Sequence, residues 1–228
     1  MKYAILFGIL SLCLLILGSL APAERWSMFW AALSFGLTAL GYAKLGPKIF
    51  GKRPSGTLFF PLKFINLPYL LYTWVIWHLW RWLSKEPAFN EVNDQLVIGR
   101  RLLPSELKGE FDHYIDLTAE FDEPKSIRSM PGYLSVPILD ATTPDPDKLK
   151  EIISTVAEGR SYIHCAQGHG RTGLFALALL IHRGTVNSVE EGIRVLQAAR
   201  PALKLNCEQL EFAKVHLQSV GDRVLEPS

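Results

Sequence analysis

The chain has 228 residues, a net charge of +2, an apolar content of 49% and a mean hydropathy of +0.16. This composition is too apolar for an ordinary soluble protein, so we expect part of the chain to lie in a membrane. The first 83 residues hold eight Lys or Arg and one Asp or Glu, a net charge of +7, and the other 145 residues carry −5. The acidic charge of this second part argues against nucleic-acid binding.

Two uncharged stretches near the N-terminus predict a helical membrane hairpin. They cover residues 3–20 and 26–43, and each would span about 27 Å as a helix, close to the hydrocarbon thickness of a bilayer. A cleaved signal peptide is the alternative for the first stretch, because Lys2, the apolar run and Ala21-Pro22-Ala23 mimic its three regions. The hairpin is favoured because the apolar run is long for a signal peptide and a second run follows at once.

Basic residues flank the hairpin at both of its ends. Lys2 precedes it, and the basic residues that follow it are Lys44, Lys48, Lys52, Arg53 and Lys63. Because Lys and Arg concentrate on the cytoplasmic side of membrane helices, we expect both ends of a multi-pass anchor, and the domain that follows it, to face the cytoplasm. In a bacterium this membrane would be the inner one.

A third apolar segment, residues 64–82, differs from the first two in composition. It contains the polar or helix-breaking residues Asn66, Pro68 and His78, and four of the six tryptophans of the chain: Trp74, Trp77, Trp80 and Trp82. Tryptophan favours the headgroup level, so we expect an interfacial or re-entrant helix on the inner leaflet. If the segment crosses the bilayer instead, the C-terminal domain faces outward. We expect the membrane segment to comprise residues 1–83.

Residues 84–228 show the alternating pattern of one compact α/β domain. Short β-branched runs predict strands at residues 95–98, 114–117, 133–138 and 162–164. Amphipathic spacing predicts helices at residues 146–157, 171–182, 189–200 and 208–219. Asp145 and Pro146 are typical of a helix start, with Asp as the N-cap and Pro as the first helical residue.

The cysteines are too few for a disulfide framework and indicate a reducing compartment. They are Cys13, Cys165 and Cys207, and the last is predicted to be a half-buried structural residue. The sequence has no Cys-x-x-Cys, His-Glu-x-x-His or Walker-type motif. We therefore expect no cofactor and no metal. His164, Cys165 and His169 fall in one turn without a fourth ligand at a usual spacing, so a metal site there is not expected.

The most informative stretch runs from Ser161 to Leu174, where a short apolar strand leads into Cys165, a glycine-containing loop and an apolar helix. Backbone N–H groups of such a loop can point at an anion, and a helix N-terminus adds partial positive charge. Arg171, six residues after Cys165, can bind two phosphate oxygens with its guanidinium group. The same field favours the Cys165 thiolate.

The run His164-Cys165-x5-Arg171-Thr172-Gly173 resembles the signature of the cysteine-dependent protein tyrosine phosphatase superfamily, and the short chain around it resembles the dual-specificity branch. The resemblance covers roughly residues 90–220. It implies an α/β fold, with a dual-specificity phosphatase-like central sheet flanked by helices, preceded here by N-terminal transmembrane helices. The implied activity is that of a phosphoric monoester hydrolase that forms a phosphocysteine intermediate.

The resemblance also implies a general acid ahead of the nucleophile. Asp140 ends a strand-and-loop segment 25 residues before Cys165, and it would protonate the leaving oxygen and then activate water. Asp145 and Asp147 are its rivals. The N-cap role accounts for Asp145 and a first-turn helix dipole for Asp147, so Asp140 is favoured. Asp116, inside a strand, is expected to be structural.

Other residues take supporting roles in this resemblance. Thr172 would donate a hydrogen bond to the cysteine sulfur, although capping the helix start is an alternative role. His164 would support the geometry and thiolate of Cys165. Arg200, followed by Asn206 and Gln209, resembles the C-terminal helix-loop-helix whose residues brace the core.

The loop after the nucleophile is expected to bind substrate. Its residues are Ala166, Gln167, Gly168, His169, Gly170 and Arg171. It holds none of the lysines that lipid-directed relatives often carry, so multiply phosphorylated inositol lipids are not indicated. A phosphoprotein or a membrane phospholipid is the expected partner, besides the bilayer itself, since tethering raises the effective concentration of both.

Two other classes remain as alternatives. The chain could be a catalytically idle, membrane-tethered phosphate-binding scaffold, but nucleophile, arginine, hydroxyl and candidate acid are all present. Sulfur transferases and arsenate reductases also use a loop cysteine. The latter carry it near the start of the domain, whereas Cys165 lies in the C-terminal half.

Overall fold

The computed structural model describes residues 1–107 and 109–217. Its internal contacts divide the chain into two compact units. The first comprises Met1–Lys85 together with Ala119–Glu123, and the second comprises Glu86–Thr118 and the chain from Pro124 onwards.

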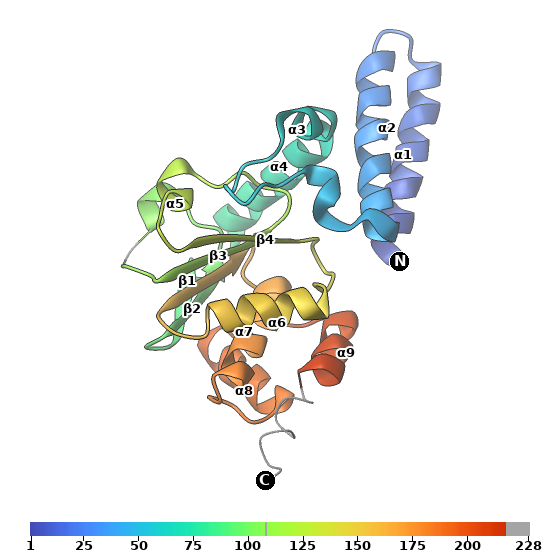
Figure 1. Ribbon diagram of the computed structural model, residues 1–228. Coiled ribbons are helices and arrows are strands. Elements are labelled where there is room, and N and C mark those ends of the chain that lie inside the picture. The colour runs from blue at the N-terminus through green and yellow to red at the C-terminus, as the bar shows by residue number, and fades with distance from the viewer. Residues whose placement is uncertain (108, 218–228) are drawn as a thin grey trace. The chain divides into compact units, whose positions relative to one another are not determined.

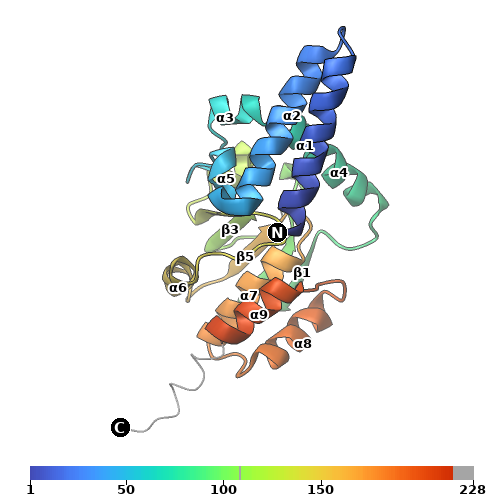
Figure 2. The same ribbon diagram turned by 90° about the vertical axis from the view of Figure 1, so that its right-hand side faces the viewer.

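The first unit is helical. Its elements are α1 (Lys2–Leu20), α2 (Arg25–Leu40), the π-helical turn η1 (Gly41–Leu45), the 3-10 helix η2 (Gly46–Phe50), α3 (Phe60–Ile65) and α4 (Leu67–Leu83). The helices α1 and α2 lie side by side as a hairpin (Figures 1 and 2). Small residues allow this approach, because a Cβ added at Gly18 would lie 2.9 Å from the Phe29 ring. The Ser11 hydroxyl donates to the Ala32 carbonyl across the pair at 2.7 Å.

Among the described residues, α1 alone is long and apolar enough to cross a membrane. By length and composition, a membrane anchor and a signal sequence both fit it. The expected stretch at residues 26–43 is helical throughout, because α2 ends at Leu40 and continues directly as the π-helical turn η1, but α2 itself has 16 residues and is not among the described helices long enough to span. The turn begins at Gly41, where a Cβ would lie 2.5 Å from the Ile49 side chain, so the chain packs tightly there.

The third apolar segment, residues 64–82, was expected to form one helix and is instead interrupted at Asn66. Asn66 is fully buried, and its Nδ2 donates to the carbonyls of Ile49 and Leu62 at 3.0 and 2.9 Å. It separates α3 from α4 because its side chain serves these carbonyls rather than continuing a straight helix. The α4 backbone is tied to α2 by the Tyr69 N–H, which donates to the Ser34 hydroxyl at 3.1 Å.

The second unit is built on a five-stranded mixed sheet. Its strands are β1 (Phe89–Asn93), β2 (Leu96–Arg100), β3 (His113–Thr118), β4 (Tyr133–Ile138) and β5 (Ser161–Cys165), in the order β1-β2-β5-β3-β4. Only the β1–β2 pair is antiparallel within this sheet. The central strand β5 has parallel neighbours on both sides and is buried throughout.

Helices cover one face of the sheet. They are α6 (Pro146–Thr155), α7 (Gly170–His182), α8 (Val189–Ala199) and α9 (Cys207–His216), and both views show them on the same side (Figures 1 and 2). The short elements η3 (Pro104–Glu106) and α5 (Lys125–Arg128) complete the unit. Helix α7 is buried from Arg171 to Leu180, so its sequence is apolar on every side rather than amphipathic.

The alternation of β5 divides its side chains between the two faces. Ile163 and Cys165 belong to the main core under the helices, whereas Tyr162 belongs to a smaller cluster on the other face. The His164 ring contacts the Tyr114 and Tyr162 rings, with centroids 5.0 and 5.8 Å apart. Cys165 and His164 therefore point to opposite sides of the sheet.

The predicted strands and helices of this unit are confirmed; several of their ends coincide and the others that can be compared shift by one or two residues. Strand β1 was not predicted, because the sequence Phe-Asn-Glu-Val-Asn is polar and only partly buried. The predicted end of the last helix, residues 218 and 219, lies outside the described residues. Cys207 is exposed, so its prediction as a half-buried residue is wrong; it occupies the first turn of α9.

Candidate active site

Cys165 lies at the carboxyl end of the central strand β5, between the parallel neighbours β2 and β3. Its side chain belongs to the core and is 3% exposed. The carboxyl ends of parallel strands are where open α/β sheets bind ligands, because the loops to the following helices begin there. The topology thus places the predicted nucleophile at the edge of the sheet where a site is expected.

The loop after Cys165 turns back on the sulfur and then becomes α7. The Gly168 N–H donates to the Cys165 Sγ at 3.2 Å, and the helix begins two residues later at Gly170. This N–H and the positive end of the α7 dipole both favour an anion held in front of the sulfur.

Glycine is required at position 168 for two reasons. Its φ of +77° lies in the left-handed region, and a Cβ there would lie 2.4 Å from the Gly99 carbonyl carbon and 2.8 Å from the Arg100 nitrogen. Because Gly168 has no side chain, the loop packs directly on the backbone of β2. Gly99 is restricted for a separate reason, since its own Cβ would lie 2.5 Å from the Ala88 carbonyl oxygen and from the Tyr162 hydroxyl.

Arg200 braces this loop from the end of α8. It is 2% exposed, and its Nη2 donates to the Gln167 carbonyl at 3.1 Å. Its Nη1 donates to the Pro87 carbonyl at 3.1 Å and to Asn90 Oδ1 at 2.8 Å. Burial lowers the pKa of Arg200, and the Glu86 carboxylate opposes that shift. Arg200 was expected to be structural, and in the structure it holds the loop after Cys165 directly, through the Gln167 carbonyl.

Glu86 is a site neighbour that the sequence analysis missed. Its Oε2 lies 2.9 Å from His169 Nε2 and 3.4 Å from an Arg200 guanidinium nitrogen. His169 stands in the loop, so the carboxylate fixes the orientation of the imidazole. No sequence signal marks Glu86, because its partners follow it by 83 and 114 residues.

Arg171 and Asp140 are brought together by the structure. Arg171 is 2% exposed; its Nη1 donates to the Ile138 carbonyl at 2.9 Å, and its Nη2 lies 3.2 Å from Asp140 Oδ1. The Asp140 side chain is 67% exposed at the end of β4. The candidate acid therefore stands beside the arginine of the loop and is open to water.

The rival carboxylates have other surroundings. Asp145 is the N-cap of α6, where its Oδ1 accepts from the Lys148 N–H at 3.0 Å. Asp147 is exposed in the first turn of the same helix. Both positions agree with the helix roles that the sequence predicted for them.

The remaining predicted residues lie close to the loop. The Thr172 hydroxyl is buried and, among the described residues, meets no hydrogen-bond partner. His164 is fully buried, with Nδ1 3.3 Å from the Cys165 carbonyl oxygen and Nε2 3.8 Å from Asp116 Oδ1. Asp116 accepts from Thr118 and from the Tyr133 hydroxyl, so it is embedded in hydrogen bonds as a structural residue would be. The other predicted loop residues, Ala166, Gln167 and Gly170, are partly exposed.

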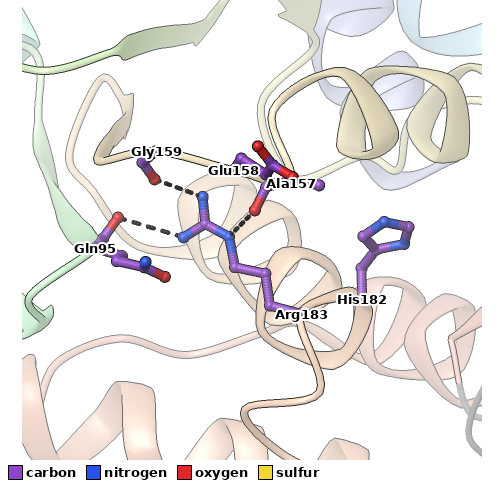
Figure 3. A pocket seen from close by; sticks show the side chains of 6 residues that line it. All are labelled: Gln95, Ala157, Glu158, Gly159, His182 and Arg183. Carbon is purple, nitrogen blue, oxygen red and sulfur yellow. Dashed lines mark hydrogen bonds between the residues drawn. The ribbon is translucent and has the colours of Figure 1, made fainter.

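A separate depression lies at the other end of α7. It is lined by Gln95, Ala157, Glu158, Gly159, His182 and Arg183 (Figure 3). Arg183 lies across it and donates to the carbonyls of Val156, Ala157 and Gly159. Burial lowers the pKa of Arg183. Because the Arg183 guanidinium group already donates to these carbonyls, we assign it a structural role rather than a second anion site, and call this arrangement the Arg183 clamp.

Comparison with known proteins supports the resemblance of this unit to tyrosine phosphatases. No family model matches the chain. A curated relative named "Putative tyrosine phosphatase 197R", from Invertebrate iridescent virus 6, is 30% identical over 126 residues, or 50% of this chain and 47% of the relative. The chain thus spans about half the length of that relative.

Solved structures share the fold. Tk-PTP in its active form is 25% identical and aligns over 58% of this chain and 97% of its own, with a TM-score of 0.51. PTPMT1 in complex with PI(5)P is 16% identical over 60% of this chain and 99% of its own, with a TM-score of 0.51, and shows the fold alone. The fold, a mixed sheet flanked by helices, is dual-specificity phosphatase-like, and the relatives are consistent with a phosphoric monoester hydrolase.

The contact between Gly168 and β2 predicts a large effect of Gly168→Ala. We expect the free energy of unfolding to fall by about 1 kcal/mol for the left-handed conformation and by a further 1–3 kcal/mol, roughly, for the clash with β2. Phosphate binding should weaken as well, because the N–H that faces the sulfur moves. Denaturant unfolding and phosphate titration of the full chain measure both.

Gly184→Ala is the matched control for this variant. Gly184 has a φ of +67°, but nothing lies within 4 Å of its added Cβ, so it reports the backbone strain without the clash. Equal destabilisation of the two variants, with phosphate binding intact, would contradict the role given to the Gly168–Gly99 contact.

Proposed function

We propose that the protein is a membrane-anchored phosphatase that hydrolyses phosphate monoesters of proteins or membrane lipids through a phosphocysteine intermediate. The observation that carries this proposal is the Gly168 N–H directed at the Cys165 sulfur at the start of α7. With Arg171 beside it, this arrangement matches the requirements of a thiolate nucleophile facing a phosphate group.

In the first step the Cys165 thiolate attacks phosphorus. A sulfur–phosphorus bond forms and the bond from phosphorus to the substrate oxygen breaks. Arg171 and the loop N–H groups bind the non-bridging oxygens, and Asp140 gives its proton to the leaving oxygen. The exposure of Asp140 supports this role, because the leaving oxygen of a substrate can reach it from solvent.

In the second step water attacks the phosphocysteine. Asp140, now a carboxylate, takes a proton from that water, and the sulfur leaves as a thiolate while inorganic phosphate forms. The Thr172 hydroxyl donates a hydrogen bond to the departing sulfur in this proposal. Its buried position next to Arg171, without another partner among the described residues, supports that assignment.

Both substrate classes fit the loop. Its residues from Ala166 to Arg171 include no lysine, and its histidine is paired with Glu86, which favours substrates with one phosphate group at the reacting position. A structure of this fold, PTPMT1, was solved with PI(5)P, so a lipid phosphate stays a candidate beside phosphorylated Ser, Thr and Tyr.

The anchor is proposed to be the segment up to residue 83, with the phosphatase domain from residue 84. Helix α1 supports it most directly, since its apolar side chains are exposed along its length, among them Ile5, Ile9, Leu12 and Ile16. We place α2 in the bilayer as the return helix and α4 on the inner leaflet, where the exposed rings of Trp74 and Trp82 favour the headgroups.

Cys165→Ser is expected to abolish hydrolysis of an aryl phosphate while phosphate binding is retained, because the hydroxyl is a far weaker nucleophile than a thiolate. Wild type, Cys165→Ser and the exposed control Cys207→Ser would be compared as full chains in detergent, with lipid phosphates and phosphopeptides in parallel. Turnover by Cys165→Ser would refute the nucleophile. A wild type that binds phosphate but hydrolyses none of these substrates would favour the idle scaffold.

Asp140→Ala is expected to lower kcat by roughly 10²-fold and to remove the basic limb of the pH profile, since that limb reports loss of the acid's proton. Asp145→Ala is the matched control and should change stability through its lost cap, with the pH profile unchanged. If Asp145→Ala removes the limb instead, the general acid is misassigned.

The orientation is tested by a reporter fused after Ser228. A cytoplasmic domain predicts that a reporter active only outside the inner membrane stays silent, while a cytoplasmic reporter at the same position is active. The reverse pattern would mean that the 64–82 segment crosses the bilayer.

A further inference from the structure

The turn that carries Asp140 contains a strained residue. Ala141 has a φ of +58° and is the one non-glycine residue with a positive φ within the described ranges 1–107 and 109–217. The left-handed region is disfavoured for any residue with a Cβ, so surrounding contacts must hold the turn. From inside the turn, the N–H and the hydroxyl of Thr142 donate to the Leu139 carbonyl at 3.3 and 3.0 Å.

The other contacts come from the first turn of α9. Asn206 Nδ2 donates to the Ala141 carbonyl at 2.9 Å, and Gln209 Nε2 donates to the Thr142 carbonyl at 3.2 Å. These bonds join positions 65 and 67 residues apart in the chain. They engage two successive carbonyls, and therefore fix the peptide plane that follows the strained residue.

The same two side chains also cap α9. Asn206 Oδ1 accepts from the Gln209 N–H at 2.9 Å, and Gln209 Oε1 accepts from the Asn206 N–H at 3.2 Å. This is a capping box, for which Ser with Glu would serve equally well. Ser and Glu could form the cap but have no NH₂ group to donate to the turn after Asp140. An amide side chain has both an oxygen that accepts in the cap and an NH₂ group that donates to the turn, so capping alone does not explain why these positions hold Asn and Gln.

Gln209 also lies against Gly170, at the end of the loop that follows Cys165. It is 1% exposed, and a Cβ added at Gly170 would lie 2.8 Å from its Oε1. Gly170 immediately precedes Arg171, the partner of Asp140. One buried amide therefore lies against the start of α7 and at the same time holds the turn after Asp140.

We propose that Asn206 and Gln209 are positioning residues that hold the strained turn at Ala141 and thereby keep Asp140 in place to protonate the leaving group. This inference rests on the proposed function. Neither residue touches the substrate in it, so substrate affinity is not expected to depend on them. What depends on them is the rate of the step that needs a proton.

The test compares two aryl phosphates with the full-length Asn206→Ser variant. Ser is as good an N-cap as Asn but has no NH₂ group to reach the Ala141 carbonyl. For phenyl phosphate, whose leaving group needs a proton, we expect kcat to fall by about tenfold or more. For dinitrophenyl phosphate, whose leaving group departs as a stable anion, we expect a loss under about twofold, with KM unchanged for both.

Two further variants complete the experiment. Ser188→Ala removes the cap of α8, where the Ser188 hydroxyl accepts from the Glu191 N–H. Any change in kcat should be the same for the two aryl phosphates. Asp140→Ala should show the selective loss for phenyl phosphate in larger measure. If Asp140→Ala shows it and Asn206→Ser lowers both rates alike or neither, the positioning role is overturned while the acid assignment stands. If Asp140→Ala itself shows no selectivity, the acid assignment fails and the positioning role with it.

Discussion

The Gly168 N–H reaches the Cys165 sulfur because the loop turns in the left-handed region and, with no side chain at Gly168, lies against the backbone of β2 at Gly99 and Arg100. Other contacts fix the same loop: the Arg101 N–H donates to the Cys165 carbonyl at 2.8 Å, and Arg200 holds the Gln167 carbonyl. Backbone donors held in this way need no reorganisation when an anion arrives, which is the condition for electrostatic stabilisation of a transition state.

The two buried arginines near the loop have different kinds of partner. Arg200 serves carbonyl or amide oxygens at Pro87, Asn90 and Gln167, so moving it would leave several buried acceptors without a donor. Arg171 donates to the Ile138 carbonyl and also lies beside the mostly exposed Asp140 carboxylate, where an ion pair contributes little.

The sequence predicted the loop and the central elements well because their signals are local. The strand before Cys165 and the apolar helix from Arg171 follow from periodicity and spacing, and Asp145 follows from capping chemistry. Strand β1 was missed because edge strands tolerate polar residues such as Asn90. Glu86 was missed because its contacts join residues 83 or more apart.

The Arg183 clamp has a consequence for how this unit folds. Its hydrogen bonds reach Gln95, between β1 and β2, and the segment between α6 and β5, so partners 24 to 88 residues away must meet at one guanidinium group. Closing such long loops costs entropy before the bonds form. The hydrogen bonds of Arg183 should therefore form late in folding. The backbone amide hydrogens around Arg183 should exchange with solvent hydrogen as one cooperative group together with those of α7.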